Sequence, residues 1–259
     1  HLMMELRFNI LNEYVDKFII VESKFSHSGK RKNLSFDLNN YKKFKDKIIY
    51  LVIDEEPKDL LKLKNDNNDS SILRLNSIKR LEQSYEYIKF GLEDANDDDV
   101  ILLSDNDEIP DLNKCDFSRI ENKIYIFEQK IMNYKLNLFY DLIPWHGSRA
   151  CKFKMIKSFP WLKNLKNKNY PFWRLDVYFN KLKSMNIQII SSGGWHFNNL
   201  KTAEELYRKL VNQGHHNEFD ASKITVEELQ KKIDNKVAFY NHKADKTEIN
   251  KYNFEYKLK

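Results

Sequence analysis

Cysteine is scarce in this chain, whose 259 residues include two, Cys115 and Cys151. Two cysteines cannot build the disulfide framework of a small secreted domain, and no metal-ligand spacing links them. The sequence also lacks a run of about 20 apolar residues, which a transmembrane helix needs, and a signal-peptide pattern at its start. We therefore expect a protein of a reducing, cytoplasmic compartment, and a bacterial or viral source fits.

A dense basic stripe and a glycine-rich phosphate loop are absent as well. The 44 Lys and Arg residues exceed the 38 Asp and Glu residues and give a net charge of +6, but acids are scattered among the basic residues. Binding along a nucleic-acid backbone needs clustered basic residues, so we expect no nucleic-acid partner. A mildly basic protein fits an anionic cofactor, or peripheral contact with a negatively charged membrane surface.

Helices that alternate with short apolar runs predict an α/β fold in one large domain. The runs at 17–22, 48–53 and 100–103 are typical of strands buried on both faces, as in parallel sheets. Helical spacing is clear at 3–14 and 72–92, so a mostly parallel central sheet is expected. The remainder is predicted as an antiparallel extension (123–139 and 149–156), an irregular aromatic region (157–175), a short strand (187–190), C-terminal helices (202–213 and 225–234) and a peripheral tail (241–259).

The stretch 100–110 combines the third of these strands with three acids. The apolar run leads directly into Asp105, Asp107 and Glu108. In open α/β sheets the ligand binds beyond the carboxyl ends of the strands. Clustered carboxylates repel one another and favour a cation between them. This stretch therefore predicts a site for a divalent metal.

Three explanations of Asp105-x-Asp107 stay open at this point. An acidic turn that caps the next helix is the commoner origin of a bare pair of acids. Phosphatases of the haloacid dehalogenase type also place Asp-x-Asp after a buried strand, but Ile109 stands where they usually carry Thr or Val. Metal-dependent sugar transferases use Asp-x-Asp to hold Mn²⁺ or Mg²⁺ against a nucleotide diphosphate. A calcium EF-hand is excluded, because Ile109 occupies a position that needs an oxygen ligand.

Two further clusters contain residue types that suit a ligand site. The stretch 193–197, Gly-Gly-Trp-His-Phe, joins glycines that permit close backbone approach to an indole and a metal-capable imidazole. The stretch 173–176, Trp-Arg-Leu-Asp, places a carboxylate in an aromatic-rich region where a sugar could stack. Each alone is equally compatible with a core, loop or surface role, and their occurrence together on one chain favours a site.

The sequence resembles glycosyltransferase family 17, which includes the β-1,4-mannosyl-glycoprotein N-acetylglucosaminyltransferase that makes bisecting GlcNAc. Four stretches carry the resemblance, in the family's order: Glu-Leu-Arg-Phe-Asn-Ile-Leu (5–11), Val-Glu-Ser-Lys-Phe-Ser-His-Ser-Gly-Lys (21–30), Asp-Val-Ile-Leu-Leu-Ser-Asp-Asn-Asp-Glu-Ile-Pro (99–110) and Gly-Gly-Trp-His-Phe (193–197). No single stretch is decisive, and together they are specific.

This resemblance implies a GT-A-like glycosyltransferase with a Rossmann-like sheet, formed by a single domain over residues 1–259. Residues of about 3–118 would form the nucleotide-sugar and metal half, and those of about 119–240 the acceptor half. The resemblance further implies inversion at the anomeric carbon, UDP-GlcNAc as the donor, and Mn²⁺ or Mg²⁺ as the cofactor. A glycan, glycolipid or glycoprotein is the expected acceptor.

The site residues follow from these motifs and from the resemblance. Metal ligands are expected at Asp105, Asp107 and His196, and the base that takes the acceptor proton is expected to be Asp176 or Glu108. Contacts to the UDP-sugar are expected from Glu22, Ser23, Lys30, Arg74, Arg80, Asp105, Trp195 and His216. A metal-dependent phosphohydrolase and a non-catalytic carbohydrate-binding module are the alternative functions.

Overall fold

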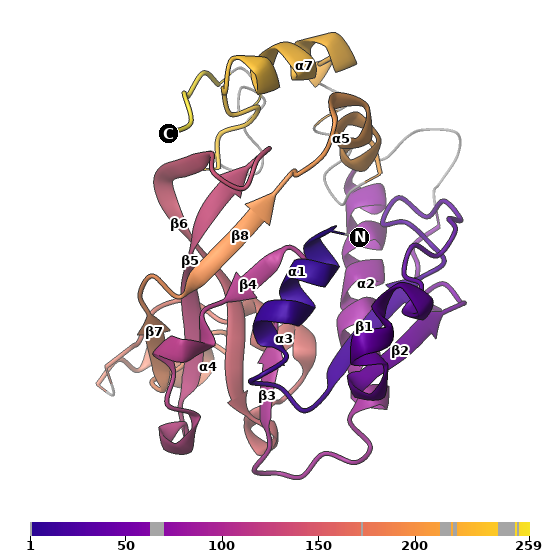
Figure 1. The fold of residues 1–259 in the computed structure, drawn as a ribbon. Coiled ribbons are helices and arrows are strands. Elements are labelled where there is room, and N and C mark those ends of the chain that lie inside the picture. The colour runs from indigo at the N-terminus through magenta and orange to yellow at the C-terminus, as the bar shows by residue number, and fades with distance from the viewer. Residues whose placement is uncertain are drawn as a thin grey trace.

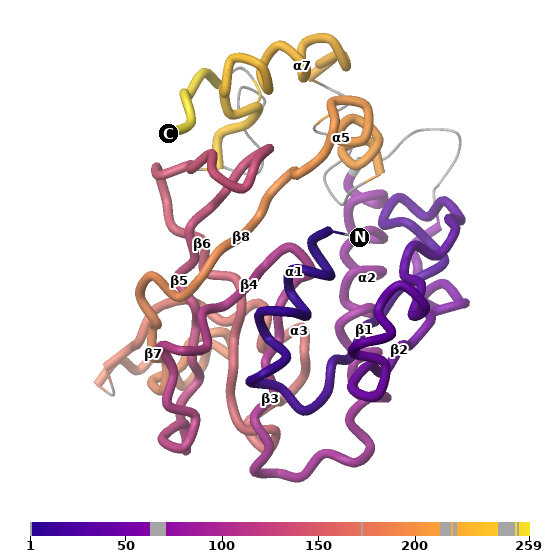
Figure 2. The backbone as a smooth tube through the Cα atoms, in the orientation of Figure 1, coloured from indigo at the N-terminus to yellow at the C-terminus, as the bar shows by residue number. Residues whose placement is uncertain are grey.

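The computed structural model describes residues 2–62, 70–171, 173–212, 219, 222–242, 252 and 254–259. Within these residues the fold is mixed α/β, with a two-stranded sheet beside a six-stranded one. Figure 1 shows helices α5 and α7 at one end of the molecule and helix α1 between the two sheets. The backbone trace in Figure 2 shows the C-terminal residues returning to the same end as α7.

The smaller sheet consists of β1 (Phe18–Ser23) and β2 (Ile48–Ile53), which run parallel. The prediction of a strand in each of these segments is confirmed. Helix α1 (Leu2–Leu11) packs on them through Phe8, which is fully buried and lies 4.8 Å from the Phe18 ring. Burying one such side chain contributes about 1.5–3 kcal/mol to folding. This packing fixes α1 against the sheet.

The long helix predicted at 72–92 is also present. Helix α2 (Ser70–Glu86) continues into a 3-10 turn at Tyr87–Gly91. It lies beside β1 and β2 in Figure 1, and its half-buried Tyr85 reaches the acidic stretch, with its hydroxyl 3.0 Å from Asp105 Oδ1. Helix α2 therefore joins the N-terminal sheet to the acids.

The larger sheet is mixed, with strand order β3-β6-β5-β8-β4 and β7 paired to β5. Strand β5 is antiparallel to β6 and parallel to β7 and β8, while β3 is antiparallel to β6 and β4 is antiparallel to β8. The strands are β3 (Val100–Leu103), β4 (Glu108–Pro110), β5 (Ile124–Asn133), β6 (Phe139–Lys152), β7 (Ile187–Ile190) and β8 (Gly194–Asn198).

The prediction of a mostly parallel central sheet is therefore wrong. Among the described residues β3 pairs with β6, antiparallel, with Val100 opposite Lys152 and Leu103 opposite Arg149, and it does not join β1 and β2. The physical reason is that an unbroken apolar run indicates burial on two faces but carries no information on strand direction. A GT-A-like, Rossmann-like arrangement is not confirmed by this mixed sheet.

Two short elements lie where irregular structure was expected. Glu108 and Pro110 belong to β4, so the third acid lies in a strand rather than in the loop after β3. Helix α3 (Phe159–Asn164) forms within the predicted irregular aromatic region. The Ser158 side chain caps it by accepting a bond from the Trp161 N–H, 3.1 Å away, and proline in its first turn needs no helical donor.

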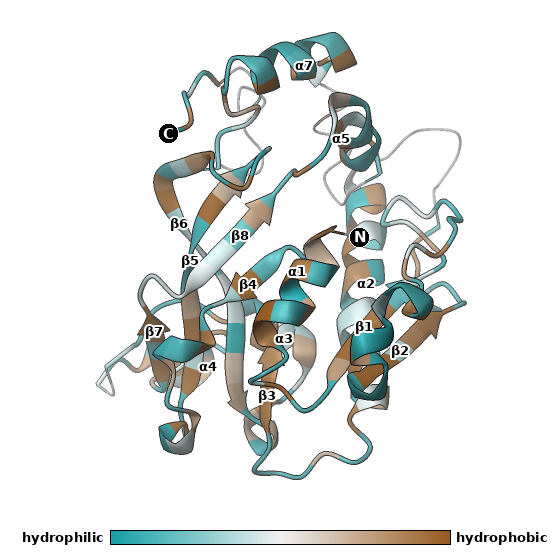
Figure 3. Cartoon of the chain, in the orientation of Figure 1, coloured by the Kyte–Doolittle hydropathy of each residue, from teal (hydrophilic) through white to brown (hydrophobic). Residues whose placement is uncertain are grey.

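The two predicted C-terminal helices are confirmed as α5 (Ala203–Leu210) and α7 (Val226–Asp234). Each begins with a Thr and Glu capping box, which satisfies two backbone donors at the helix start. In Figure 3 their outer faces are largely hydrophilic, whereas β1 and β2 are hydrophobic. The segment expected as a peripheral tail contributes Tyr252 and Leu258 to the apolar core under these helices, because both are large apolar side chains.

No helix in the described ranges is long and apolar enough to span a bilayer.

Candidate active site

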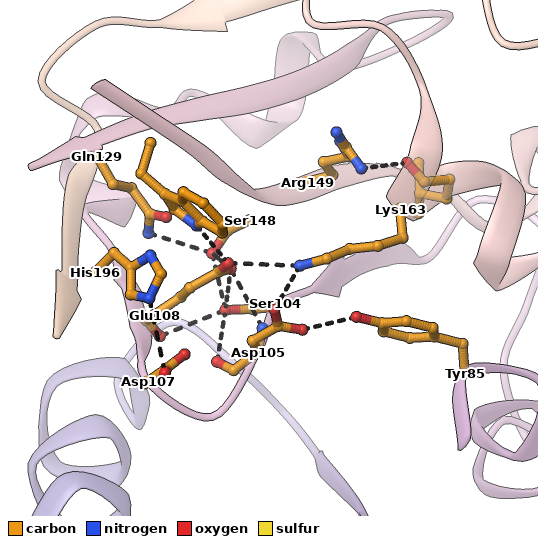
Figure 4. A network of polar contacts seen from close by, with 12 residues as sticks. Tyr85, Ser104, Asp105, Asp107, Glu108, Gln129, Ser148, Arg149, Lys163 and His196 are labelled. Carbon is orange, nitrogen blue, oxygen red and sulfur yellow. Dashed lines mark hydrogen bonds and ion pairs between the residues drawn. The ribbon is translucent and has the colours of Figure 1, made fainter. Parts of the chain in front are cut away.

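The acidic stretch turns sharply between β3 and β4. The Glu108 N–H donates to the Asp105 carbonyl over 3.1 Å, which closes the turn and separates the three acids. Figure 4 shows Asp105 facing Lys163 and Tyr85, while Asp107 faces His196 on the other side of the turn. The three carboxylates therefore have different surroundings, although they lie within four positions of one another.

Asp105 is held by two donors from outside the motif. Its Oδ1 accepts from the Tyr85 hydroxyl at 3.0 Å and its Oδ2 from Lys163 Nζ at 2.8 Å. Burial and the negative charge of Asp105 raise the pKa of Tyr85 above its usual value, so this hydroxyl keeps its proton and donates. The carboxylate is 36% exposed, so one side of it still faces solvent.

Glu108 is fully buried and both of its carboxylate oxygens are bonded. Its Oε1 accepts from the Trp145 indole at 2.8 Å, and its Oε2 accepts from the Ser148 hydroxyl at 2.9 Å. Lys163 Nζ lies 3.4 Å from Oε1. Burial alone would raise the pKa of Glu108, but the Lys163 charge and the Trp145 bond outweigh it and lower the pKa below the usual value.

Gly147 of β6, next to Ser148, leaves no room for a side chain. A Cβ added to Gly147 would overlap both Glu108 Oε1 and the Trp145 indole nitrogen. Any side chain at this position would therefore displace the buried carboxylate.

Two arginines add positive charge near the acids. Arg7 of α1 donates to the Ser104 hydroxyl at 2.9 Å, to the Asp105 carbonyl at 3.1 Å and to the Glu108 carbonyl. Arg149 of β6 is 5% exposed and donates to two carbonyls at the end of α3. Burial lowers the pKa of Arg149 to about 10, against the opposing charge of Glu108. With Lys163, these cations balance the acids.

Asp107 and His196 form the second part of the site. His196 Nε2 lies 3.6 Å from Asp107 Oδ2, because the Phe197 N–H bonds the Asp107 carbonyl at 2.8 Å and joins β8 to the turn. Burial would raise the pKa of Asp107, but the nearby His196 and the charge of Lys209 outweigh it and lower the pKa to about 2. Asp107 therefore stays anionic, with its side chain 28% exposed.

The imidazole of His196 is positioned by packing. Its ring centre lies 4.4 Å from that of Trp145, edge to face, and its Nδ1 is buried without a hydrogen-bond partner in the part of the chain that the structure describes. Among those residues no group of three or more His, Cys, Asp or Glu side chains converges as a metal site. Asp107 and His196 are a pair that suits a hard divalent cation whose other ligands come from phosphate and water.

The paired glycines serve strand packing. Gly194 has a φ of +121°, and a Cβ there would overlap the Ile109 carbonyl of β4. The Gly193 N–H donates to the Glu128 carbonyl at 2.6 Å, and its carbonyl accepts from the Asp111 N–H at 2.9 Å. The close approach that we expected toward a ligand is thus made toward β4 and β5, and it brings His196 to the acidic turn.

Glu22 at the end of β1 holds the following chain. Its Oε1 accepts from Lys32 Nζ at 2.9 Å and from the Ser35 N–H at 2.8 Å. Its Oε2 accepts from the Phe36 N–H at 3.0 Å and from the Tyr50 hydroxyl at 2.9 Å. With both oxygens bonded, Glu22 organises the loop after β1 in this structure.

The other N-terminal candidates surround that loop. Ser23 accepts from the Phe25 N–H at 3.0 Å, and Lys30 is exposed. Arg80 of α2 makes two bonds to Glu56, of 2.6 and 3.0 Å, and donates to the His27 carbonyl at 3.1 Å. Arg80 therefore lies against the loop, and its guanidinium is already paired with Glu56; its contact with the UDP-sugar stays a prediction.

The remaining candidates are dispersed. Arg74 is half-buried on α2, and Trp195 is 36% exposed on β8, next to His196. Asp176 begins α4 (Asp176–Phe179) and pairs with Arg174 at 2.8 Å and with Lys183, and none of its contacts in the described part of the chain involves the acidic turn. His216 lies outside the described residues.

Several residues of the network were not predicted. Arg7 lies inside one of the stretches that carry the family resemblance, and that is a signal that could have found it. Tyr85 lies in the stretch 72–92, where the sequence predicts a helix but gives no sign of a bond to an acid. Lys163, Arg149 and Ser148 have no motif around them, so only the fold brings them to the acids.

The model of glycosyltransferase family 17 matches residues 2–237. This range contains the acidic turn, β8 and every predicted site residue. No curated protein and no solved structure matches the chain.

Proposed function

The chain belongs to glycosyltransferase family 17, and from this we propose that it transfers a sugar from a UDP-sugar to a hydroxyl of a glycan. GlcNAc is the proposed sugar, and inversion at the anomeric carbon is the proposed outcome. A glycan, a glycolipid or a glycoprotein would carry the accepting hydroxyl. Mn²⁺ or Mg²⁺ is the proposed cofactor.

The observation that carries this proposal is the approach of His196 to Asp107. The two residues come from opposite halves of the sequence, and their facing atoms are 3.6 Å apart. One is a carboxylate that is 28% exposed, and the other is an imidazole whose Nε2 faces that carboxylate. We propose that they hold the divalent metal, which would supply positive charge to the diphosphate leaving group.

The rest of the network would hold this pair and the donor in place. Lys163 and Tyr85 fix the Asp105 carboxylate, whose exposed side we propose contacts the donor directly or through water. Arg7 of α1 binds the Ser104 hydroxyl and the backbone of the turn. Preorganised groups of this kind cost no reorganisation when charge develops during reaction.

The two residues predicted as the base are reassigned. Glu108 is fully buried with both oxygens bonded, so an acceptor hydroxyl does not reach it in this conformation. We propose that Glu108 is a positioning residue for Lys163 and Trp145. Asp176 is bound by Arg174 and Lys183, which lower its pKa to about 2 and make it a weak proton acceptor. We assign it to the surface of α4, and we propose that the exposed side of the Asp105 carboxylate takes the acceptor proton instead.

The nucleotide is proposed to lie at the carboxyl ends of β1 and β2. The loop there contacts both halves of the chain, since the Ser28 hydroxyl lies 3.4 Å from Asn212 Oδ1 after α5. Arg80 supports this loop through the His27 carbonyl. A nucleotide between this loop and the acidic turn would contact Ser23 and Lys30 on one side and the Asp107 region on the other.

Thermal shift measurements test the proposal. UDP, UDP-GlcNAc and Mn²⁺ are added alone and in combination, and transfer is then measured on a panel of glycans. We expect a shift for UDP-GlcNAc with Mn²⁺ that is larger than either alone. A shift with Mn²⁺ and phosphate mimics that UDP does not change would indicate a phosphohydrolase instead. A shift with glycans alone would indicate a binding module.

A further inference from the structure

Four large side chains around α4 are strongly exposed. Trp173 is 69% exposed, Leu175 73%, Tyr178 62% and Phe179 86%. We call these four residues the α4 patch. Val177, which is 8% exposed, faces inward and anchors the helix. Single exposed apolar residues are normal on a protein surface, but four within seven positions concentrate apolar surface on one short segment, as at sites that bind a partner.

Basic residues lie on both sides of the α4 patch along the chain. Between residues 166 and 183 five residues are Lys or Arg, and Asp176 is the one acid. The Tyr170 ring has Arg174, Lys183 and Lys168 over it at 5.5, 5.4 and 6.0 Å. Asp176 is already paired with two of these cations. The surface is thus positively charged as well as apolar.

The α4 patch is tied to the helix that carries Lys163. The Trp161 indole of α3 donates to the Lys181 carbonyl at 2.8 Å, and the Lys166 N–H donates to the Leu182 carbonyl at 2.9 Å. Figure 1 shows α4 near β7, at the end of the molecule opposite α7. The patch therefore lies on the α3 side of the acidic network.

We propose that the α4 patch docks on an anionic lipid surface. Aromatic and aliphatic side chains enter the boundary between head groups and acyl chains, and Lys and Arg beside them attract anionic head groups. Charge complementarity selects this occupant over a second copy of the chain. A two-fold contact would place the same basic surface against itself, and like charges facing each other oppose such a dimer.

Vesicle co-sedimentation tests this proposal without any sugar donor, so its result is separate from that of the transfer assay. Vesicles of phosphatidylcholine are compared with an equal mixture of phosphatidylcholine and phosphatidylglycerol. We expect binding to the mixed vesicles, weakening as salt is raised, and little to phosphatidylcholine. The double variant Leu175→Ser/Phe179→Ser should lower the partition coefficient at least about tenfold.

Exposed apolar residues elsewhere provide the control. Leu136 and Phe90 are 48% and 49% exposed, and Leu136→Ser/Phe90→Ser should bind mixed vesicles as the wild type does. The melting temperature of each double variant is measured to check that it is folded. The proposal is overturned if the wild type does not bind mixed vesicles, or if the control variant loses as much binding as the patch variant. It is also overturned if the patch variant changes the mass in sedimentation equilibrium while vesicle binding stays the same.

Discussion

Lys163 Nζ lies 2.8 Å from the Asp105 carboxylate, although the two residues are 58 positions apart in the sequence. The same ammonium group lies 3.4 Å from Glu108. A side-chain cation thus occupies the position between two acids where the sequence predicts a metal. The remaining acid, Asp107, faces His196. Of the three predicted metal ligands, we therefore propose these two side chains and no longer Asp105.

Replacing Lys163 tests its role as the internal counter-charge. Lys163→Met keeps the aliphatic stem but leaves Glu108, which is fully buried, without its cation. Removing one partner of a buried ion pair costs about 3–5 kcal/mol, and we expect a loss of this size in urea unfolding. Lys166→Met, at an exposed lysine close by, should change stability by no more than about 0.5 kcal/mol. Equal stabilities of the two variants would contradict the role of Lys163.

A methyl group at position 147 should disrupt the buried carboxylate. Gly147→Ala places a Cβ on Glu108 Oε1 and on the Trp145 indole. We expect a loss of about 1–3 kcal/mol from overpacking, together with a loss of transfer. Glu108→Ala combined with Gly147→Ala relieves the overlap with the carboxylate and leaves the one with the Trp145 indole, so the effects of the two substitutions should add only in part. Fully additive losses in unfolding free energy would show that the two positions do not meet.

The loop after β1 should respond to acid through Glu22. Burial would raise the pKa of Glu22, but the bonds from Lys32, Ser35 and Phe36 outweigh it, so the folded-state pKa lies below the usual 4.5. The stabilisation is therefore complete above the unfolded-state pKa and is lost as pH falls below about 4.5. Glu22→Gln should reduce the dependence of unfolding free energy on pH in that range. Lys32→Met removes one of the groups that lower the pKa of Glu22, so it should reduce this pH dependence too. An unchanged pH dependence in both variants would exclude Glu22 as the acid-sensitive group of the loop.

Much of the fold could be predicted from local sequence pattern. The apolar runs of β1, β2 and β3 and the helical spacing of α2 lie in contiguous segments, so burial and periodicity are readable within each one. The direction of β3 could not be predicted, because its pairing with β6 depends on residues 149–152, about fifty positions away. Helix α3 was missed, since it has six residues, which begin with Phe, Pro and Trp and carry too little periodicity.

The residues of the site likewise divide into those that local sequence motifs predict and those that only the fold brings together. Asp105, Asp107 and His196 stand in short motifs, and the structure brings Asp107 and His196 together. Lys163 and Arg149 were not predicted, because a lone basic residue in a basic chain carries no local signal. Asp176 was chosen for its aromatic neighbours, which in the structure are largely exposed on α4.

Calorimetric titration of UDP tests the central proposal most directly, with the wild type in Mn²⁺ and in EDTA and with Asp107→Asn and His196→Gln in Mn²⁺. We expect wild-type affinity to fall at least about tenfold in EDTA, and each variant to bind UDP in Mn²⁺ as weakly as the wild type does in EDTA. His146→Gln, at a histidine of β6 that faces Glu128 at 3.8 Å, should bind as the wild type does. Equal UDP affinity in EDTA, or variants that bind UDP with Mn²⁺ like the wild type, would contradict a metal held by Asp107 and His196.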